Sequence, residues 1–228
     1  MNGRHVRVRR TCCPWVVCAV ALIVLSGCAP PADAVKPPQA PDGMVGVALN
    51  ASPDDLALTR SDLPAGFQLA AEKSSGPEYF ALYLRPSALD PEASGGNSLL
   101  SVLTSVAVYT TTADAERVYL EASADPTKPA SEDVALVSGA ATDIVTQPFE
   151  GAAQGADASE AYRVTYRLKG RRIFEYGHRV RLGNVLAYVV VAAIGNPDEP
   201  QHLLEDARDL VQRQIDHIAE AASPSAPK

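Results

Sequence analysis

Three histidines follow residue 28, and His178 is the one whose neighbours at a spacing of two residues are mostly apolar. The expected pairing of its strand brings it near Tyr162 and Tyr176. An imidazole beside phenol groups in an apolar pocket can bind a ligand. The same imidazole can instead be a core residue whose nitrogens bond to a tyrosine hydroxyl or a backbone carbonyl. We expect His178 to be mostly buried on the helix-facing side of the sheet, and both interpretations of it stay open at this point.

A second candidate site is a cluster of basic residues between positions 163 and 181. Seven of the 16 bases that follow residue 27 lie in these 19 residues, which contain a single acid, Glu175. Arginine beside an aromatic side chain suits anionic groups such as carboxylate, phosphate or lipid headgroups, whereas a charged sheet face can also serve only to stay solvated. The seven bases are Arg163, Arg167, Lys169, Arg171, Arg172, Arg179 and Arg181. A period of two residues predicts that four of them, Arg163, Arg167, Arg179 and Arg181, share the outer face of a sheet.

The expected domain contains no recognisable catalytic or metal-binding motif. Its serines lack the Gly-x-Ser-x-Gly and Ser-x-x-Lys patterns of hydrolases. His202 and His217 are fifteen residues apart on one expected helix, whereas metal ligands on a helix are three or four residues apart. Asp54 and Asp55 fall at an expected helix start, where negative charge complements the helix dipole. We therefore expect no catalytic residue, no metal and no cofactor.

The N-terminus has the pattern of an export signal. Residues 1–10 hold four arginines and no acid, and an almost unbroken apolar run extends from Trp15 to Leu25. A basic segment followed by about ten apolar residues is typical of a secretory signal, because a membrane-spanning helix needs about 20. The run ends at Leu25-Ser26-Gly27-Cys28, which closely resembles the lipobox of bacterial lipoproteins.

This resemblance implies cleavage before Cys28 and a diacylglyceryl thioether on its sulfur. Two or three acyl chains anchor a protein stably, since one chain alone binds a membrane only marginally. The alternative is an uncleaved signal anchor in which Cys28 has no role. The other cysteines, Cys12, Cys13 and Cys18, precede the expected cleavage site, so the exported domain would have no disulfide and no thiolate metal site.

Composition divides the rest of the chain into a tether, one domain and a tail. Five prolines fall within residues 28–41, which favours an extended, polyproline-like tether. The expected organisation is a signal peptide at residues 1–27, a proline-rich tether at 28–44, a single domain at 45–221 and a disordered tail at 222–228. Residues 28–228 carry 16 bases and 27 acids, a net charge of −11, which argues against nucleic acid as a partner.

The clearest predicted structure is a three-stranded meander over residues 162–169, 172–182 and 185–194. A two-residue turn at Gly183-Asn184 predicts that His178 pairs with Val189. A three-residue loop at 169–171 predicts that Tyr166 pairs with Phe174. Further strands are expected over 79–84, 99–109 and around 142–146, and helices over about 112–125 and 200–221.

This order predicts an α+β fold, in which an antiparallel sheet of about five to six strands packs two helices on one face. The layout is similar to other small α+β domains of secreted bacterial lipoproteins, including those with the Mog1/PsbP-like fold. No motif in the chain assigns the domain to that family, so no functional residue follows from the similarity.

The sequence therefore predicts an exported protein that is anchored by lipid on Cys28 to the extracytoplasmic face of the cell membrane. Its domain is expected to be a non-catalytic module that binds a ligand or a partner of the cell envelope. An anionic ligand, a lipid headgroup and an envelope protein are the candidate partners. The alternatives are an envelope hydrolase with an unfamiliar site, and a structural or chaperone-like lipoprotein.

Overall fold

A computed structural model describes residues 48–89, 99–124, 141–149, 153–195 and 202–222. The chain divides into two compact units, residues 1–34 and 35–228, and every described residue belongs to the second. The predicted signal peptide, Cys28 and the proline-rich tether lie outside the described residues. Within the described part, no helix has the length and apolar character needed to cross a membrane.

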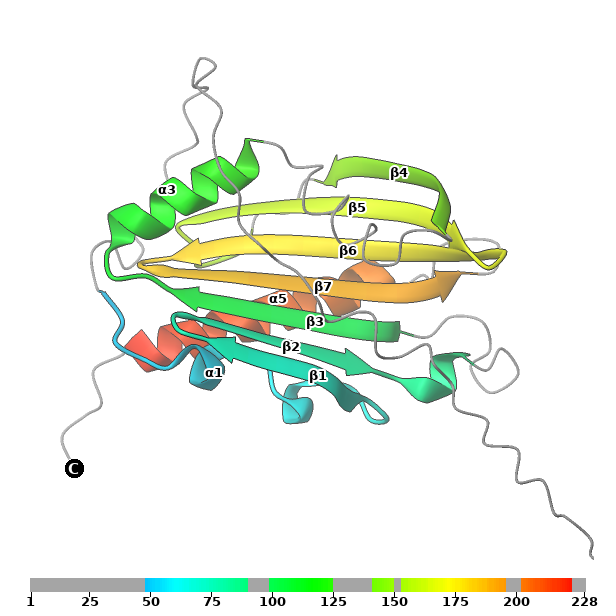
Figure 1. Cartoon of the computed structure of the whole chain (residues 1–228), viewed down its shortest axis with the longest axis horizontal. Helices are drawn as coiled ribbons and strands as arrows, with labels where there is room; N and C mark the ends of the chain where they lie inside the picture. Colours follow the sequence, from blue (N-terminus) through cyan, green and yellow to red (C-terminus); the bar gives the residue numbers. More distant parts are fainter. Residues whose placement is uncertain (1–47, 90–98, 125–140, 150–152, 196–201, 223–228) are drawn as a thin grey trace, which may run out of the picture. The chain divides into compact units, whose positions relative to one another are not determined.

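The fold is α+β, as predicted, and its centre is one antiparallel sheet of seven strands in the order β1-β2-β3-β7-β6-β5-β4 (Figure 1). The strands are β1 (Gln68–Ser75), β2 (Glu78–Leu84), β3 (Leu99–Val108), β4 (Ala141–Phe149), β5 (Ala158–Leu168), β6 (Arg171–Leu182) and β7 (Val185–Gly195). The helices are α1 (Pro53–Leu56), α3 (Thr112–Ser123) and α5 (Leu203–Ala222), with short 3-10 helices η2 (Arg60–Asp62) and η3 (Pro86–Leu89).

The expected count of five to six strands is wrong because β1 was not predicted. Its sequence, QLAAEKSS, has no strict alternation, and seven of its eight residues are exposed. As an edge strand, β1 pairs only with β2, so it does not need the alternating apolar side chains of a half-buried strand. Strand prediction from alternation finds half-buried strands and misses a solvated edge.

The predicted pairing of β6 with β7 is confirmed. Leu182 pairs with Val185 and His178 with Val189, around a two-residue turn at Gly183-Asn184. Gly183 has a φ of 58°, which is the left-handed conformation that glycine adopts without strain.

The predicted pairing of β5 with β6 is wrong by one residue. The connection is a two-residue turn, in which Lys169 and Gly170 both have positive φ (49° and 78°), and Tyr166 pairs with Ile173 instead of Phe174. Lysine is not a residue that signals a left-handed conformation, so the sequence favoured the longer loop. Because successive side chains alternate between faces, this slip moves every residue of β5 to the other face of the sheet.

The two long helices pack on opposite faces of the sheet, so the prediction of two helices on one face is also wrong. The α5 face, which includes Val102, His178 and Val180, packs against the apolar stripe of α5. The α3 face includes Arg179, whose charge acts on the buried Tyr119 of α3. Figure 1 shows α5 behind the strands and α3 near the arrowhead of β6.

Both faces of the sheet carry buried apolar side chains. The α5 face forms the larger core, and a second cluster on the opposite face consists of Tyr162, Val164, Tyr166, Ile173 and Ala192. The buried residues of α3, Ala115 and Tyr119, belong to neither cluster.

Candidate functional site

His178 lies on the α5 face and is only 3% exposed, which confirms the prediction that it is buried toward a helix. Neither ring nitrogen has a hydrogen-bond partner within the described part of the chain. Burial lowers the pKa of His178 to about 4, and the positive charge of Arg208 on α5 contributes in the same direction. The imidazole is therefore neutral at physiological pH.

The surroundings of His178 are aromatic and apolar. Tyr176, two residues away on the same face of β6, makes an edge-to-face contact with Phe149 at 5.5 Å between ring centroids. The Arg208 guanidinium lies 5.6 Å from the centre of the Phe149 ring. Among the described residues, the charged group that shifts the pKa of His178 is the cation Arg208, which adds to the effect of burial in favouring the neutral ring.

Tyr162 lies on the opposite face of the sheet, so the predicted cluster of Tyr162, Tyr176 and His178 does not form. Tyr162 pairs with Gly177, and a Cβ atom built on Gly177 would overlap the Tyr162 ring. The ring also stacks on Tyr188 at 6.2 Å between centroids. The one-residue difference in the pairing of β5 causes this separation.

The four arginines predicted on one outer face are divided between the two faces, so that prediction is wrong as well. Arg163 pairs with Tyr176 and Arg167 with Arg172, which places both arginines of β5 on the α5 face. Arg179 and Arg181 of β6 lie on the α3 face. Arg163 donates a hydrogen bond to Gln147 of the neighbouring strand (Nη2 to Oε1, 2.6 Å).

Arg179 and Arg181 are structural. Arg179 is paired with Glu160, and its guanidinium lies 5.9 Å from the centre of the Tyr188 ring. Arg181 is 3.4 Å from the carboxylate of Asp157, which also accepts a hydrogen bond from the backbone N–H of Gly183 (2.7 Å). The side chains of these arginines are only 10% and 13% exposed, so neither presents an open cationic surface.

The remaining bases gather at the turn between β5 and β6. Arg167, Lys169, Arg171 and Arg172 are all exposed, and we call them the basic tip. Arg167 forms an exposed ion pair with Asp143 at 3.2 Å, and Arg172 lies over the Phe174 ring at 5.2 Å. All four belong to the predicted cluster of seven bases, but only Arg167 among them was predicted to lie on the shared outer face, since the sequence predicted a three-residue loop at 169–171.

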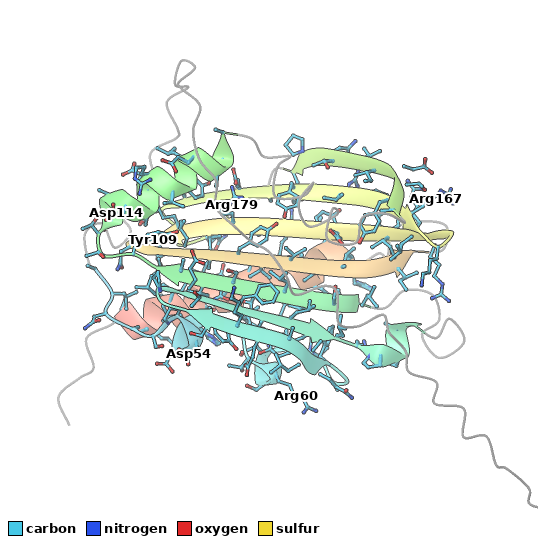
Figure 2. The ribbon with its side chains drawn as sticks, viewed as in Figure 1. Asp54, Arg60, Tyr109, Asp114, Arg167 and Arg179 are labelled. Carbon is cyan, nitrogen blue, oxygen red and sulfur yellow. The ribbon has the colours of Figure 1, made fainter. Side chains whose placement is uncertain are left out.

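At the opposite end of the sheet, the first described residues of the chain are bound to the turn between β6 and β7. Asn184, in the turn between β6 and β7, exchanges two hydrogen bonds with Leu49: the Leu49 N–H donates to Oδ1 (2.7 Å), and Nδ2 donates to the Leu49 carbonyl (3.0 Å). Nδ2 also donates to the Tyr109 carbonyl (2.5 Å). Figure 2 shows Arg167 of the basic tip and Tyr109 at opposite ends of the strands.

A small half-open cleft of about 170 Å³ lies between α5 and the segment that contains η2. Arg213 of α5 donates a hydrogen bond to the Asp62 carbonyl (2.8 Å), and His217 is 3.4 Å from the Asp62 carboxylate. Burial raises the pKa of Asp206 above its usual value, and the charge of His202 only partly offsets this. The residues that line the cleft are Asp62, Leu63, Pro64, Leu99, Asp206, Asp209, Leu210 and Arg213.

These lining residues come from three distant parts of the sequence, so no spacing could have brought them to notice. Among the described residues, no group of three or more histidine, cysteine or acidic side chains is arranged to hold a metal ion.

A comparison with known protein families finds no family model that matches the chain, and a comparison with curated proteins finds no matching sequence.

Proposed function

We propose that this protein is a lipoprotein, anchored through Cys28 to the extracytoplasmic face of the cell membrane, and that its folded part is a non-catalytic binding module. The anchor rests on the lipobox-like Leu25-Ser26-Gly27-Cys28, with its basic and apolar segments before it. The binding role rests on the way in which the charged side chains of the fold are distributed.

The observation that carries the binding role is the basic tip. The side chains of Arg179 and Arg181 are only 10% and 13% exposed, so these two cations belong to the scaffold. The exposed cations of the same two strands are concentrated at one turn, on a chain whose net charge after Cys28 is −11. A local concentration of arginine and lysine on an acidic protein suits recognition of an anionic surface.

The hydrolase alternative has weaker support. A general base must lie within hydrogen-bond distance of the group that it deprotonates, and it is usually oriented by a third group. Within the described residues the imidazole of His178 has no partner, and Arg208 disfavours the protonated form that base catalysis would produce. Its surroundings fit a core histidine better than a catalytic one.

Replacement of the expected lipid-bearing cysteine tests the anchor. In the producing host, Cys28→Ser is expected to accumulate as a precursor that retains residues 1–27 and incorporates no labelled palmitate. Cys18→Ser, a matched change within the signal peptide, should be processed and labelled like the wild type. The measurements are the intact mass and the palmitate label of the membrane fraction. Processing and labelling of Cys28→Ser at the wild-type level would show that Cys28 is not the anchor.

A further inference from the structure

We infer that the basic tip docks on the anionic bilayer surface and thereby turns the anchored domain so that its Asn184 end points away from the membrane. This inference rests on the proposed function, because it takes the domain to be tethered at Cys28. It adds a second contact with the membrane and a defined orientation.

Among the described residues, the exposed bases of β5 and β6 are concentrated at this end of the sheet, which favours its approach to an anionic surface. At physiological salt the Debye length is about 8 Å, so a surface interacts mainly with the charges nearest to it. Four bases lie within residues 167–172, whereas the chain after residue 27 has a net charge of −11. The acidic remainder is repelled while the tip is attracted, and the result is an orientation rather than general adhesion.

The turn of the tip holds a lysine in a backbone conformation that disfavours it. Arg167 and Arg172 are direct cross-strand partners, and each has a compensating contact: Arg167 pairs with Asp143 at 3.2 Å, and Arg172 lies over the Phe174 ring at 5.2 Å. Lys169 has a φ of 49°, a conformation that glycine or asparagine adopts with less strain. A strained backbone conformation that persists in a fold points to a functional role for the residue that carries it.

The shape of the tip suits a broad surface. Its four bases flank a tight two-residue turn at the end of two long strands, and all four are exposed. Lysine and arginine near an anionic bilayer are each attracted by its surface potential, and several together bind it in a salt-dependent way.

The length of the chain before the fold permits this orientation although the chain joins the sheet at the opposite end. Residues 28–47 number 20, and at about 3.1 Å per residue an extended stretch of that length spans about 60 Å. The 12 residues of β6 span about 40 Å at about 3.3 Å per residue. When extended, a stretch of 20 residues would therefore exceed the length of β6, which would allow the tip to reach a bilayer that holds Cys28.

Energy transfer from a label at the Asn184 end tests the orientation. Ser75 is exposed at that end, since it precedes the β1–β2 turn and pairs with Glu78, whose other partner is Ala107. Cys28 would be acylated, so a cysteine introduced by Ser75→Cys is the one thiol to label with a donor. The full mature lipoprotein is reconstituted into phosphatidylcholine vesicles, with or without phosphatidylglycerol, that contain an acceptor lipid.

We expect weaker transfer in the phosphatidylglycerol vesicles at low salt, because the tip holds residue 75 away from the surface, and loss of this difference at high salt. The variant Lys169→Gln/Arg171→Gln/Arg172→Gln should lose the difference at low salt too. The control Arg60→Gln/Lys73→Gln/Arg117→Gln makes the same change in net charge at exposed positions away from the tip and should keep it. Circular dichroism verifies that each variant is folded, and Arg171→Glu alone serves as a second tip variant.

The possible failures are distinguishable. If the mass shows the acyl chains but transfer is equal in the two kinds of vesicle, the docking inference is overturned and the anchor stands. If the tip and control variants lose the difference in energy transfer equally, overall charge is responsible and the docking inference is overturned. The docking inference is also overturned if the tip binds soluble polyphosphate while phosphatidylglycerol has no effect on transfer. If the mass shows no acyl chain, the anchor fails, and vesicle co-sedimentation that the tip variant loses would still support the tip.

Discussion

At the residue scale, the imidazole of His178 gives the fold a specific sensitivity to acid. Its pKa is about 4 in the folded protein, because it is buried beside the cation Arg208, and 6.5 is the ordinary value. Below pH 6.5 the imidazole therefore binds a proton in the unfolded chain, whereas in the folded protein it is protonated only below about pH 4. The contribution of the neutral imidazole to the free energy of unfolding is fully present above pH 6.5. It decreases as the pH falls through this window, by about 2 kcal/mol between pH 7.5 and pH 5.

The variant His178→Leu should lose this part of the pH dependence and be at least as stable as the wild type at pH 7.5, since it removes two buried nitrogens without partners. Urea unfolding at several pH values measures the difference. His178→Gln, polar but without a titrating group, is the matched control and should show the same flattening. An unchanged slope in both variants would contradict the assignment to His178. The sequence predicted that this residue is buried, because one hairpin turn was recognisable, but alternation alone could not reveal that its nitrogens lack partners.

At the scale of the element, the contact between Tyr162 and Gly177 secures the pairing of β5 with β6. The tyrosine ring covers the glycine and stacks on Tyr188, so it occupies the space that a side chain at position 177 would need. Gly177→Ala should destabilise the protein by about 1–3 kcal/mol, the usual range for overpacking. In a Tyr162→Ala background the same change should cost much less, because the obstructing ring is gone and glycine is a poor strand residue.

Thermal or urea unfolding of the four proteins in this double-mutant cycle gives the coupling energy between the two positions. Additive effects of the two substitutions would contradict the close contact between the Tyr162 ring and Gly177. This pairing is also where sequence reasoning failed, because Lys169 adopts a turn conformation that its residue type does not signal. The strands and their order along the chain were largely predictable, whereas the faces of β5, and with them the candidate site, depended on the length of one turn.

At the scale of the whole molecule, the sequence could not predict which face of the sheet each long helix covers. The alternation in β6 and β7 is apolar on both sides in places, so two helices on one face and one helix on each face are equally compatible with it. The acidic cleft was hidden for a related reason, since Asp62 and Asp206 meet only after α5 has packed on its face.

One buried side chain links the three parts that meet on the α5 face. Gln214 of α5 is 0% exposed, and its amide group donates to the Leu56 carbonyl at the end of α1. Its Oε1 accepts from the Leu58 N–H (3.2 Å) and from the Thr104 hydroxyl on β3 (2.8 Å). Gln214→Leu would keep the volume but leave three buried polar groups unpaired, each of which costs about 1–3 kcal/mol.

We therefore expect Gln214→Leu to destabilise the protein by at least about 3 kcal/mol, as measured by urea unfolding. Gln212→Leu, two residues earlier on the same helix, is the matched control: Gln212 is only half-buried, and its described hydrogen bond joins Asp216 within the helix (3.0 Å). That change should stay within about 0.5 kcal/mol of the wild type. Similar effects of the two variants would mean that helix propensity, and not the buried amide, determines the result. A large loss for Gln214→Leu alone would identify the contact that holds α1, β3 and α5 together, and hence the α5 face on which His178 is buried.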